Sequence, residues 1–172
     1  MVGMMGAGKT AVGSAVARIL RVPFLDSDRE IERAANMTIS EIFARDGEAF
    51  FREKETQVIE RLLKSRPCIL STGGGAFLHE RNRRIIAQSG IAVWLRADLD
   101  LLWARVRQKT TRPLLRTANP RATLTELHDA RVPEYAKAEV VVDAQPDQTI
   151  DETAARVIDA LLARSDVLET AR

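Results

Sequence analysis

The stretch MVGMMGAGKT, residues 1–10, decides the fold, because residues 3–10 spell the phosphate-loop pattern G-x-x-x-x-G-K-[ST]. Glycines in such a loop let backbone N–H groups turn toward phosphate oxygens, and the following helix directs its positive end at the same anion. Lys9 adds a full charge near the β- and γ-phosphates, and the Thr10 hydroxyl can bind Mg²⁺. The loop therefore predicts ATP as co-substrate, Mg²⁺ as cofactor, and nucleotide contacts from Gly6, Ala7, Gly8, Lys9, Thr10 and Ala11.

The residues in front of the loop are unusual, since a phosphate loop normally follows a buried strand and only Met1 and Val2 stand there. Either Gly3 and its neighbours pair weakly with the sheet, or the natural chain starts further upstream. We favour the upstream start as the expectation. The non-enzymatic alternative to the whole motif is a Gly-rich surface turn.

Short apolar segments alternate with longer amphipathic ones along the chain. Near-continuous apolar runs are typical of parallel strands buried on both faces, and the alternation predicts βαβ units. We expect a three-layer α/β/α fold with a central parallel sheet. The expected strands are 24–26, 68–72, 91–97 and 139–144, and the expected helices include 10–20, 48–64, 99–108 and 149–163.

Size and composition indicate a single globular domain over 1–172. Basic and acidic residues nearly balance at a formal charge of +2, and aromatic residues are scarce at 5%, so we expect no nucleic-acid partner. No run is long enough to predict a membrane span, and a single cysteine, Cys68, forms no internal disulfide. A cytoplasmic location is the default expectation. The basic cluster 81–84 is better explained as a solvated helix face than as a phosphate contact.

Two segments interrupt the alternation and are expected to be insertions carried by the sheet. The first, about 27–56, contains a short helix that Thr38 caps and Gly47 ends. The second, about 107–122, is polar and rich in proline and arginine, as expected of a mobile loop. Residues 165–172 are expected to fray.

Two carboxylates follow the first expected strand in the stretch FLDSD, residues 24–28. Residues two apart on an extended chain point to the same side, so Asp26 and Asp28 can both face the phosphates from the carboxyl end of the sheet. Asp26 is expected to hold Mg²⁺ through water, and Asp28 to accept the proton of an incoming hydroxyl. The structural alternative is a helix N-cap at Ser27 or Asp28.

Taken together, these segments resemble the shikimate kinase family nearly end to end. The matching stretches are GMMGAGKT, LDSD, IFARDGEAFFREKE, STGGGA, TTRPLL and RVPEYAKAE, in the family's order. Apart from the phosphate loop, no single one is decisive, but their combination is specific. The resemblance implies ATP-dependent phosphorylation of the 3-hydroxyl of shikimate, a step of aromatic amino-acid biosynthesis, by a monomer.

The resemblance also implies roles for individual residues. Shikimate carries a carboxylate, which arginine forks bind bidentately, and the family pattern places these forks on Arg52 and Arg131. Asp28 meets the ring hydroxyls. The remaining implied contacts are the turn Gly73, Gly74 and Gly75 against the ring, with Phe43 and Phe51 beside it, Arg112 from the lid on the transferred phosphoryl group, and Arg105 and Pro146 on either side of adenine.

Structural alternatives remain for several of these residues. The triple glycine can be a flexible turn, Arg105 a solvated helix residue, and the two phenylalanines ordinary core. Trp94 is expected in the core, and His79 and His128 lack partners at metal-ligand spacing. Two rival functions also stay open, a related kinase of another small alcohol such as gluconate, and a nucleotide-binding module without catalysis.

Overall fold

The computed structural model describes residues 1–107 and 117–164. Four short parallel strands pair in two ladders, β1 (Phe24–Asp26) with β2 (Ile69–Ser71) and β3 (Val93–Arg96) with β4 (Val140–Asp143). In register, Leu25 lies opposite Leu70 and Trp94 opposite Val141. All four expected strands are confirmed, each within two residues at either end.

The first two residues of the chain join the two ladders. Val2 forms a parallel bridge with Trp94, donating to Val93 O and accepting from Leu95 N, and Met1 O accepts from Thr72 N. Val2 is only 2% exposed. Of the two alternatives for this segment, pairing with the sheet is therefore seen in the structure. The phosphate loop consequently starts from a point held on both sides by backbone hydrogen bonds.

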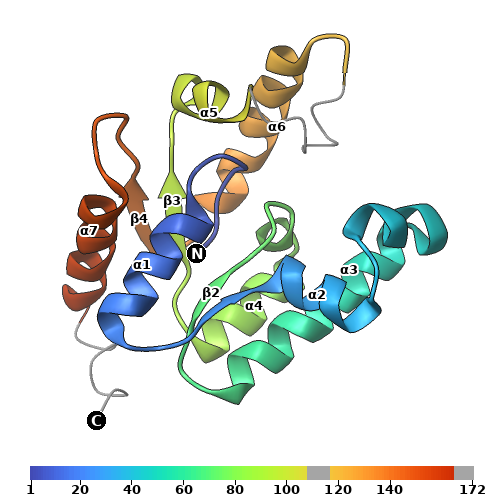
Figure 1. The fold of residues 1–172 in the computed structure, drawn as a ribbon, viewed down its shortest axis with the longest axis horizontal. Helices are drawn as coiled ribbons and strands as arrows, with labels where there is room; N and C mark the ends of the chain where they lie inside the picture. Colours follow the sequence, from blue (N-terminus) through green and yellow to red (C-terminus); the bar gives the residue numbers. More distant parts are fainter. Residues whose placement is uncertain (108–116, 165–172) are drawn as a thin grey trace.

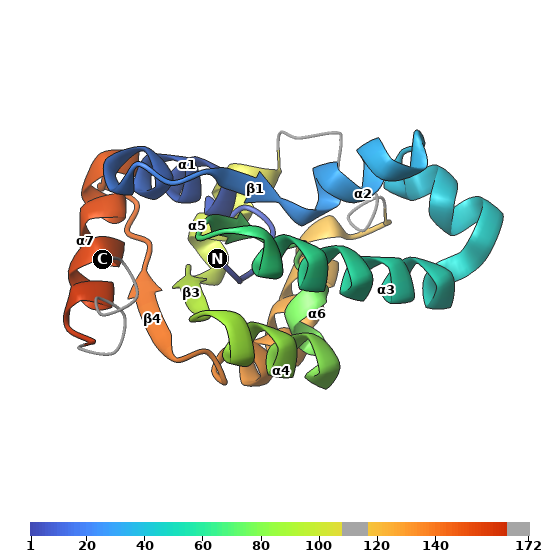
Figure 2. The same cartoon turned by 90° about the horizontal axis from the view of Figure 1, so that it is seen from below.

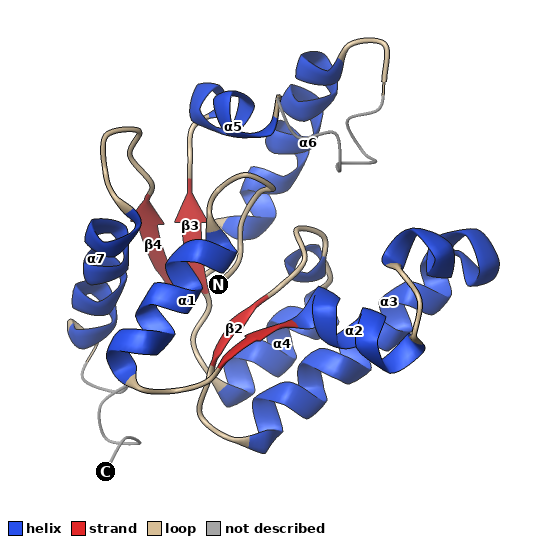
Figure 3. Cartoon of the chain, viewed as in Figure 1, coloured by secondary structure: helices blue, strands red, loops and turns tan. Residues whose placement is uncertain are grey.

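Helices lie on both sides of these strands, which confirms the three-layer α/β/α architecture (Figures 1 and 3). Helix α1 packs against β1, β2 and α7, whereas α4 and α6 lie on the opposite side of β3 (Figure 2). The helices are α1 (Lys9–Leu20), α2 (Ser27–Ala35), α3 (Ile39–Ser65), α4 (Glu80–Ser89), α5 (Leu99–Val106), α6 (Pro120–Tyr135) and α7 (Ile150–Leu162), with a 3₁₀ turn, η1 (Ala76–Leu78).

Local signals explain where the helices of the first expected insertion begin and break. Thr38 and Glu41 form a reciprocal capping box at the start of α3, which confirms the cap predicted for Thr38. Gly47 has a left-handed backbone (φ 84°) that divides α3 at the predicted position. The structural alternative of a cap at Ser27 or Asp28 is wrong for α2, because the Asp26 side chain accepts from the backbone N–H groups of Asp28 and Arg29.

Two helices, α4 and α6, were given no bounds in advance, although the cluster 81–84 was expected on a helix face. Asn119 caps α6 and Pro120 occupies its first turn, so the helix takes in the last residues of the expected lid. Its apolar residues do not form one stripe, since arginines and Pro133 interrupt them, and its helical period is therefore weak. The core is made by side chains such as Val16, Leu95 and Val157, and Trp94 is buried in it as expected. Within the described residues, no helix is long and apolar enough to cross a bilayer.

Candidate active site

The phosphate loop leaves the sheet after Val2 and runs directly into α1. Gly6 and Gly8 both have positive φ, at 83° and 98°, which only glycine adopts readily. A Cβ on Gly6 would also lie 2.6 Å from Val106 Cγ1, so the loop is packed tightly against α5. No side chain of the described residues caps α1, so the first N–H groups of this helix face the site.

Lys9 is held inside the loop by the loop's own backbone. Its Nζ donates to Gly3 O at 2.8 Å and to Met4 O at 3.0 Å. These two carbonyls fix the ammonium group above the start of α1, where a bound anion would meet the helix N-terminus. Arg105 reaches the same loop from α5, because its Nη1 donates to Ala7 O at 3.1 Å and to Gly6 O at 3.3 Å.

A cavity of about 530 Å³ opens in front of the loop. Its volume lies in the range of small-molecule and cofactor sites. The phosphate loop, the carboxyl ends of β1 and β2, Arg105 and the segment after β4 form its walls. The lining residues are Met5, Gly6, Ala7, Gly8, Lys9, Thr10, Ala11, Val12, Asp26, Asp28, Ser71, Thr72, Gly73, Gly74, Arg105, Ala144, Gln148, Thr149, Ile150 and Thr153.

Both carboxylates of the FLDSD stretch line this cavity, at the carboxyl end of β1. One oxygen of Asp26 accepts the two backbone hydrogen bonds at the start of α2, which fixes the carboxylate in place. Asp28 Oδ1 is buried and has no hydrogen-bond partner among the described residues. Burial, and secondly the charge of Asp26, raise the pKa of Asp28 from 3.8 to about 6, although Lys9 opposes the shift. A buried, unpaired carboxylate oxygen at a cavity wall is an acceptor ready for a substrate proton.

The turn Gly73–Gly75 brings three charged side chains together. A Cβ on Gly73 would lie 2.6 Å from Asp28 Oδ1, and one on Gly74 would lie 3.2 Å from Arg131 Nη1. On Gly75 it would lie 2.7 Å from Arg52 Nη2. Each glycine thus contacts a charged side chain from a different helix, namely α2, α6 and α3. The missing side chains are what allow one acid and two arginines to converge on one turn.

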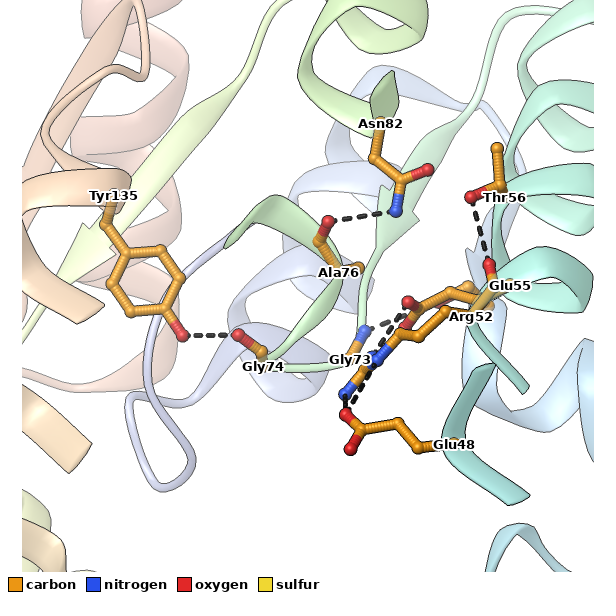
Figure 4. Close-up of polar contacts among 10 residues, drawn as sticks. Glu48, Arg52, Glu55, Thr56, Gly73, Gly74, Ala76, Asn82 and Tyr135 are labelled. Atoms are coloured by element: carbon orange, nitrogen blue, oxygen red, sulfur yellow. Dashed lines mark hydrogen bonds and ion pairs between the residues drawn. The ribbon is translucent and has the colours of Figure 1, made fainter. Parts of the chain in front are cut away.

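Arg52 is oriented by acidic residues of its own helix (Figure 4). Its Nη1 donates to Glu55 Oε2 at 2.8 Å, and its Nη2 lies 3.3 Å from Glu48 Oε1. Glu55 is 1% exposed, and burial raises its pKa although Arg52 opposes the shift. The guanidinium also lies over the ring of Phe51, 5.1 Å from its centroid. Phe51 is buried and its ring is 4.7 Å from that of Phe43, so both rings belong to the floor beneath Arg52.

Sequence reasoning overlooked four polar residues that hold this site. Asn82 Nδ2 donates to Ala76 O at 2.9 Å and Tyr135 Oη donates to Gly74 O at 2.5 Å (Figure 4). Ser27 Oγ accepts from Gly73 N. The fourth is Glu55. Its signal was available, because an acid three residues after Arg52 shares its helix face. Ser27 and Tyr135 bond to glycines 46 and 61 positions away, and Asn82 bonds to a carbonyl 6 positions away. No local sequence pattern indicates these three contacts.

The remaining expected site residues are placed as follows. Thr10 and Ala11 line the cavity beside the loop, whereas Pro146 is exposed in the segment after β4 and does not line it. Arg112 lies outside the described residues. In the basic cluster, Arg81 and Arg84 are solvated as expected, but the Arg83 side chain is only 16% exposed. Among the described residues, no group of three His, Cys, Asp or Glu side chains is arranged for a metal.

Comparisons with known proteins agree on one family. The sequence model of shikimate kinase matches residues 5–162. The chain is 67% identical to a shikimate kinase of Cereibacter sphaeroides over 170 residues, which is 99% of this chain and 85% of that protein. It is 64% identical to one of Ruegeria pomeroyi over 169 residues, 98% of this chain and 87% of the other.

Solved shikimate kinases superpose on this chain more closely than a solved gluconokinase does. A shikimate kinase of Acinetobacter baumannii in complex with shikimate superposes with a TM-score of 0.87 and 38% identity, covering 95% of this chain and 92% of that one. A gluconokinase of Sinorhizobium meliloti has a TM-score of 0.58 and 22% identity, with 95% of each chain covered, and shares the fold alone.

Proposed function

The chain belongs to the shikimate kinase family, and from that premise we propose how its residues carry out phosphorylation of shikimate by ATP. One observation carries the proposal: Asp28, Arg52 and Arg131 converge on the turn Gly73–Gly75, and this turn meets the phosphate loop at one cavity. The reaction is transfer of the γ-phosphoryl group to the 3-hydroxyl, which gives shikimate 3-phosphate and ADP.

The acceptor is held by charge and by the backbone. Arg52 and Arg131 bind the carboxylate of shikimate, since two guanidinium groups beside one glycine turn suit a planar anion. The turn itself lets the ring approach closely. Asp28 accepts the hydrogen bond of the reacting hydroxyl and takes its proton as the oxygen attacks phosphorus. Its pKa of about 6 leaves it ionised at neutral pH and still basic enough for this task.

The donor is held by the phosphate loop. Backbone N–H groups of residues 6–11 surround the phosphates, and Lys9 neutralises the developing charge on the phosphoryl group. Arg105 lines the same cavity and would stack on adenine. Arg112, from the lid of about 107–122, adds a second positive charge to the transferred group. Pro146 would close the other side of adenine. Catalysis in this scheme is positioning and charge neutralisation.

The residues present fit Mg²⁺, since Thr10 and Asp26 line the same cavity and supply the oxygen ligands that this ion prefers. Asp26 keeps one oxygen for the α2 cap and has the other for a water-mediated contact. When bound, Mg²⁺ neutralises charge on the β- and γ-phosphate oxygens. The protein's part is to hold Thr10 and Asp26 on the phosphate side of the cavity.

The test measures ADP release from ATP and Mg²⁺ with shikimate, with gluconate and without an acceptor. Shikimate-dependent release that Lys9→Ala abolishes is the expected result. Release with gluconate but not with shikimate would overturn the acceptor assignment. Nucleotide binding without turnover with either acceptor would favour a non-catalytic module.

We further propose that residues 1–172 form a single kinase domain that works as a cytoplasmic monomer, without nucleic-acid or membrane partners. The near balance of charge supports the absence of such partners. Gel filtration with light scattering of the active protein tests the monomer, and a stable dimer at micromolar concentration would contradict it.

A further inference from the structure

Tyr135, at the end of α6, presents a buried polar group that the scheme above does not use. It is fully buried, and its ring packs at 6.0 Å from that of Trp94. Packing alone would be satisfied by phenylalanine. The hydroxyl instead points at the glycine turn and donates to Gly74 O at 2.5 Å (Figure 4). A buried hydroxyl with such a partner is costly to leave unpaired, so it sets where that carbonyl lies.

Arg131, one helical turn earlier on α6, lies near the same part of the glycine turn as this hydroxyl. Burial raises the pKa of Tyr135, while the charge of Arg131 and a hydrogen bond with it act in the opposite direction. A Cβ on Gly74 would lie 3.2 Å from Arg131 Nη1 and 3.7 Å from Tyr135 Oη. The guanidinium, the phenol and the Gly74 backbone therefore meet at one point. The hydroxyl donates to the Gly74 carbonyl on one side and has the positive charge of Arg131 close to it on the other.

A second set of contacts holds the last turn of α6 against the segment that follows the glycines. Arg83 of α4 pairs with Glu134 at 2.7 Å, and its Nη1 donates to Phe77 O and Leu78 O, each at 2.8 Å. The backbone around Tyr135 is thus fixed from α4, independently of its hydroxyl. Removing the hydroxyl should leave α6 in place and release only the Gly74 carbonyl and Arg131.

We infer that Tyr135 is a positioning residue for the acceptor substrate: its hydroxyl fixes the Gly74 carbonyl, and with it the glycine turn beside the Arg131 guanidinium that binds the carboxylate. This inference rests on the proposed function, because it assigns Arg131 to the carboxylate of shikimate. The effect falls on binding of the acceptor. Tyr135 is not among the described residues that line the cavity in front of the phosphate loop, so we expect ATP binding to be unaffected.

The test compares Tyr135→Phe with the wild type by steady-state kinetics and thermal unfolding. We expect the KM for shikimate to rise about tenfold, the size of one lost hydrogen bond to a charged group, and the KM for ATP to stay within about twofold. Ile59→Val is the control for stability alone, since it removes one buried methyl group from α3. It should lower Tm without changing either KM.

A double-mutant cycle then asks whether Tyr135 acts through Arg131. In the Arg131→Ala background, Tyr135→Phe should change the shikimate KM by less than about twofold, because coupled residues are not additive. A full tenfold effect in that background would overturn the inference, as would an unchanged shikimate KM in the single variant. Absence of shikimate-dependent turnover in the wild type would instead overturn the proposed function, so the two failures are distinguishable.

Discussion

Replacing Asp28 with asparagine is expected to stabilise the protein while disabling it. The carboxylate is held in an unfavourable place: Oδ1 is buried without a partner among the described residues, and Asp26 repels it. Raising its pKa from 3.8 to about 6 corresponds to about 3 kcal/mol against the ionised form at neutral pH. The side chain borders an open cavity, so solvent screening reduces this free-energy cost. We therefore expect Asp28→Asn to raise the free energy of unfolding by about 1–2 kcal/mol at pH 7.5.

The raised pKa of Asp28 makes the free energy of unfolding depend on pH. The folded protein binds the proton of Asp28 more tightly than the unfolded chain does, so the carboxyl group favours folding below pH 3.8. That contribution is lost as the pH rises through about 6. Asparagine does not titrate, and its stability advantage over the wild type should therefore grow by about 1 kcal/mol between pH 5 and pH 8.

Urea unfolding at pH 5, 6.5 and 8 measures the free energy of unfolding of both proteins, and a coupled ADP assay measures turnover. Loss of the general base should lower kcat by about 10²–10⁴. Asp159→Asn, which removes an exposed carboxylate from α7, controls for the deletion of one charge. The reasoning would be refuted if Asp28→Asn were less stable than the wild type at pH 8, or if the difference were the same at every pH.

Three further substitutions test other parts of the site and fold. Arg52→Ala should raise the shikimate KM about 100-fold and also lower stability, because Glu55 is left buried without its partner; an unchanged KM would contradict the carboxylate assignment. Gly73→Ala places a Cβ 2.6 Å from Asp28 Oδ1 and should lower kcat about 100-fold with little change in ATP affinity, so an active variant would show that the turn is not this tight. Thr38→Ala removes the α3 capping box and should cost about 1 kcal/mol in urea unfolding while both KM values stay unchanged, and loss of activity without loss of stability would contradict this.

Short stretches of contiguous sequence were enough to predict the phosphate loop, the strands and two features of α3. The phosphate loop could be predicted because its shape needs glycines at set positions and a helix directly after them. The four strands also followed from their apolar runs, and the helix break at Gly47 and the cap at Thr38 followed from single residue types. Asp26 and Asp28 both line the cavity, as predicted, but the extended chain assumed for them is wrong, because Asp28 lies in the first turn of α2.

The bounds of helix α6 were not predicted because its sequence gives conflicting signals for a helix. Proline inside the helix and several arginines weaken its period, so packing against α5 and η1, rather than local preference, stabilises it. The position of Met1 and Val2 was equally hard to predict. Two residues carry no strand signal, and backbone groups of β3, Leu70 and Thr72 on either side place them in the sheet.

The tertiary structure alone decided how the acceptor side is built. The sequence contained Arg52, Arg131, Asp28 and three glycines, and family resemblance named their roles. It contained no sign that each glycine would face one charged side chain, or that Tyr135 would bond to Gly74, 61 positions away. Backbone dihedral preferences and the glycine spacing of a phosphate loop involve only a few contiguous residues, so they can be predicted from the sequence. Contacts between distant segments depend on how helices pack, and the free energy that selects them exists only in the folded state.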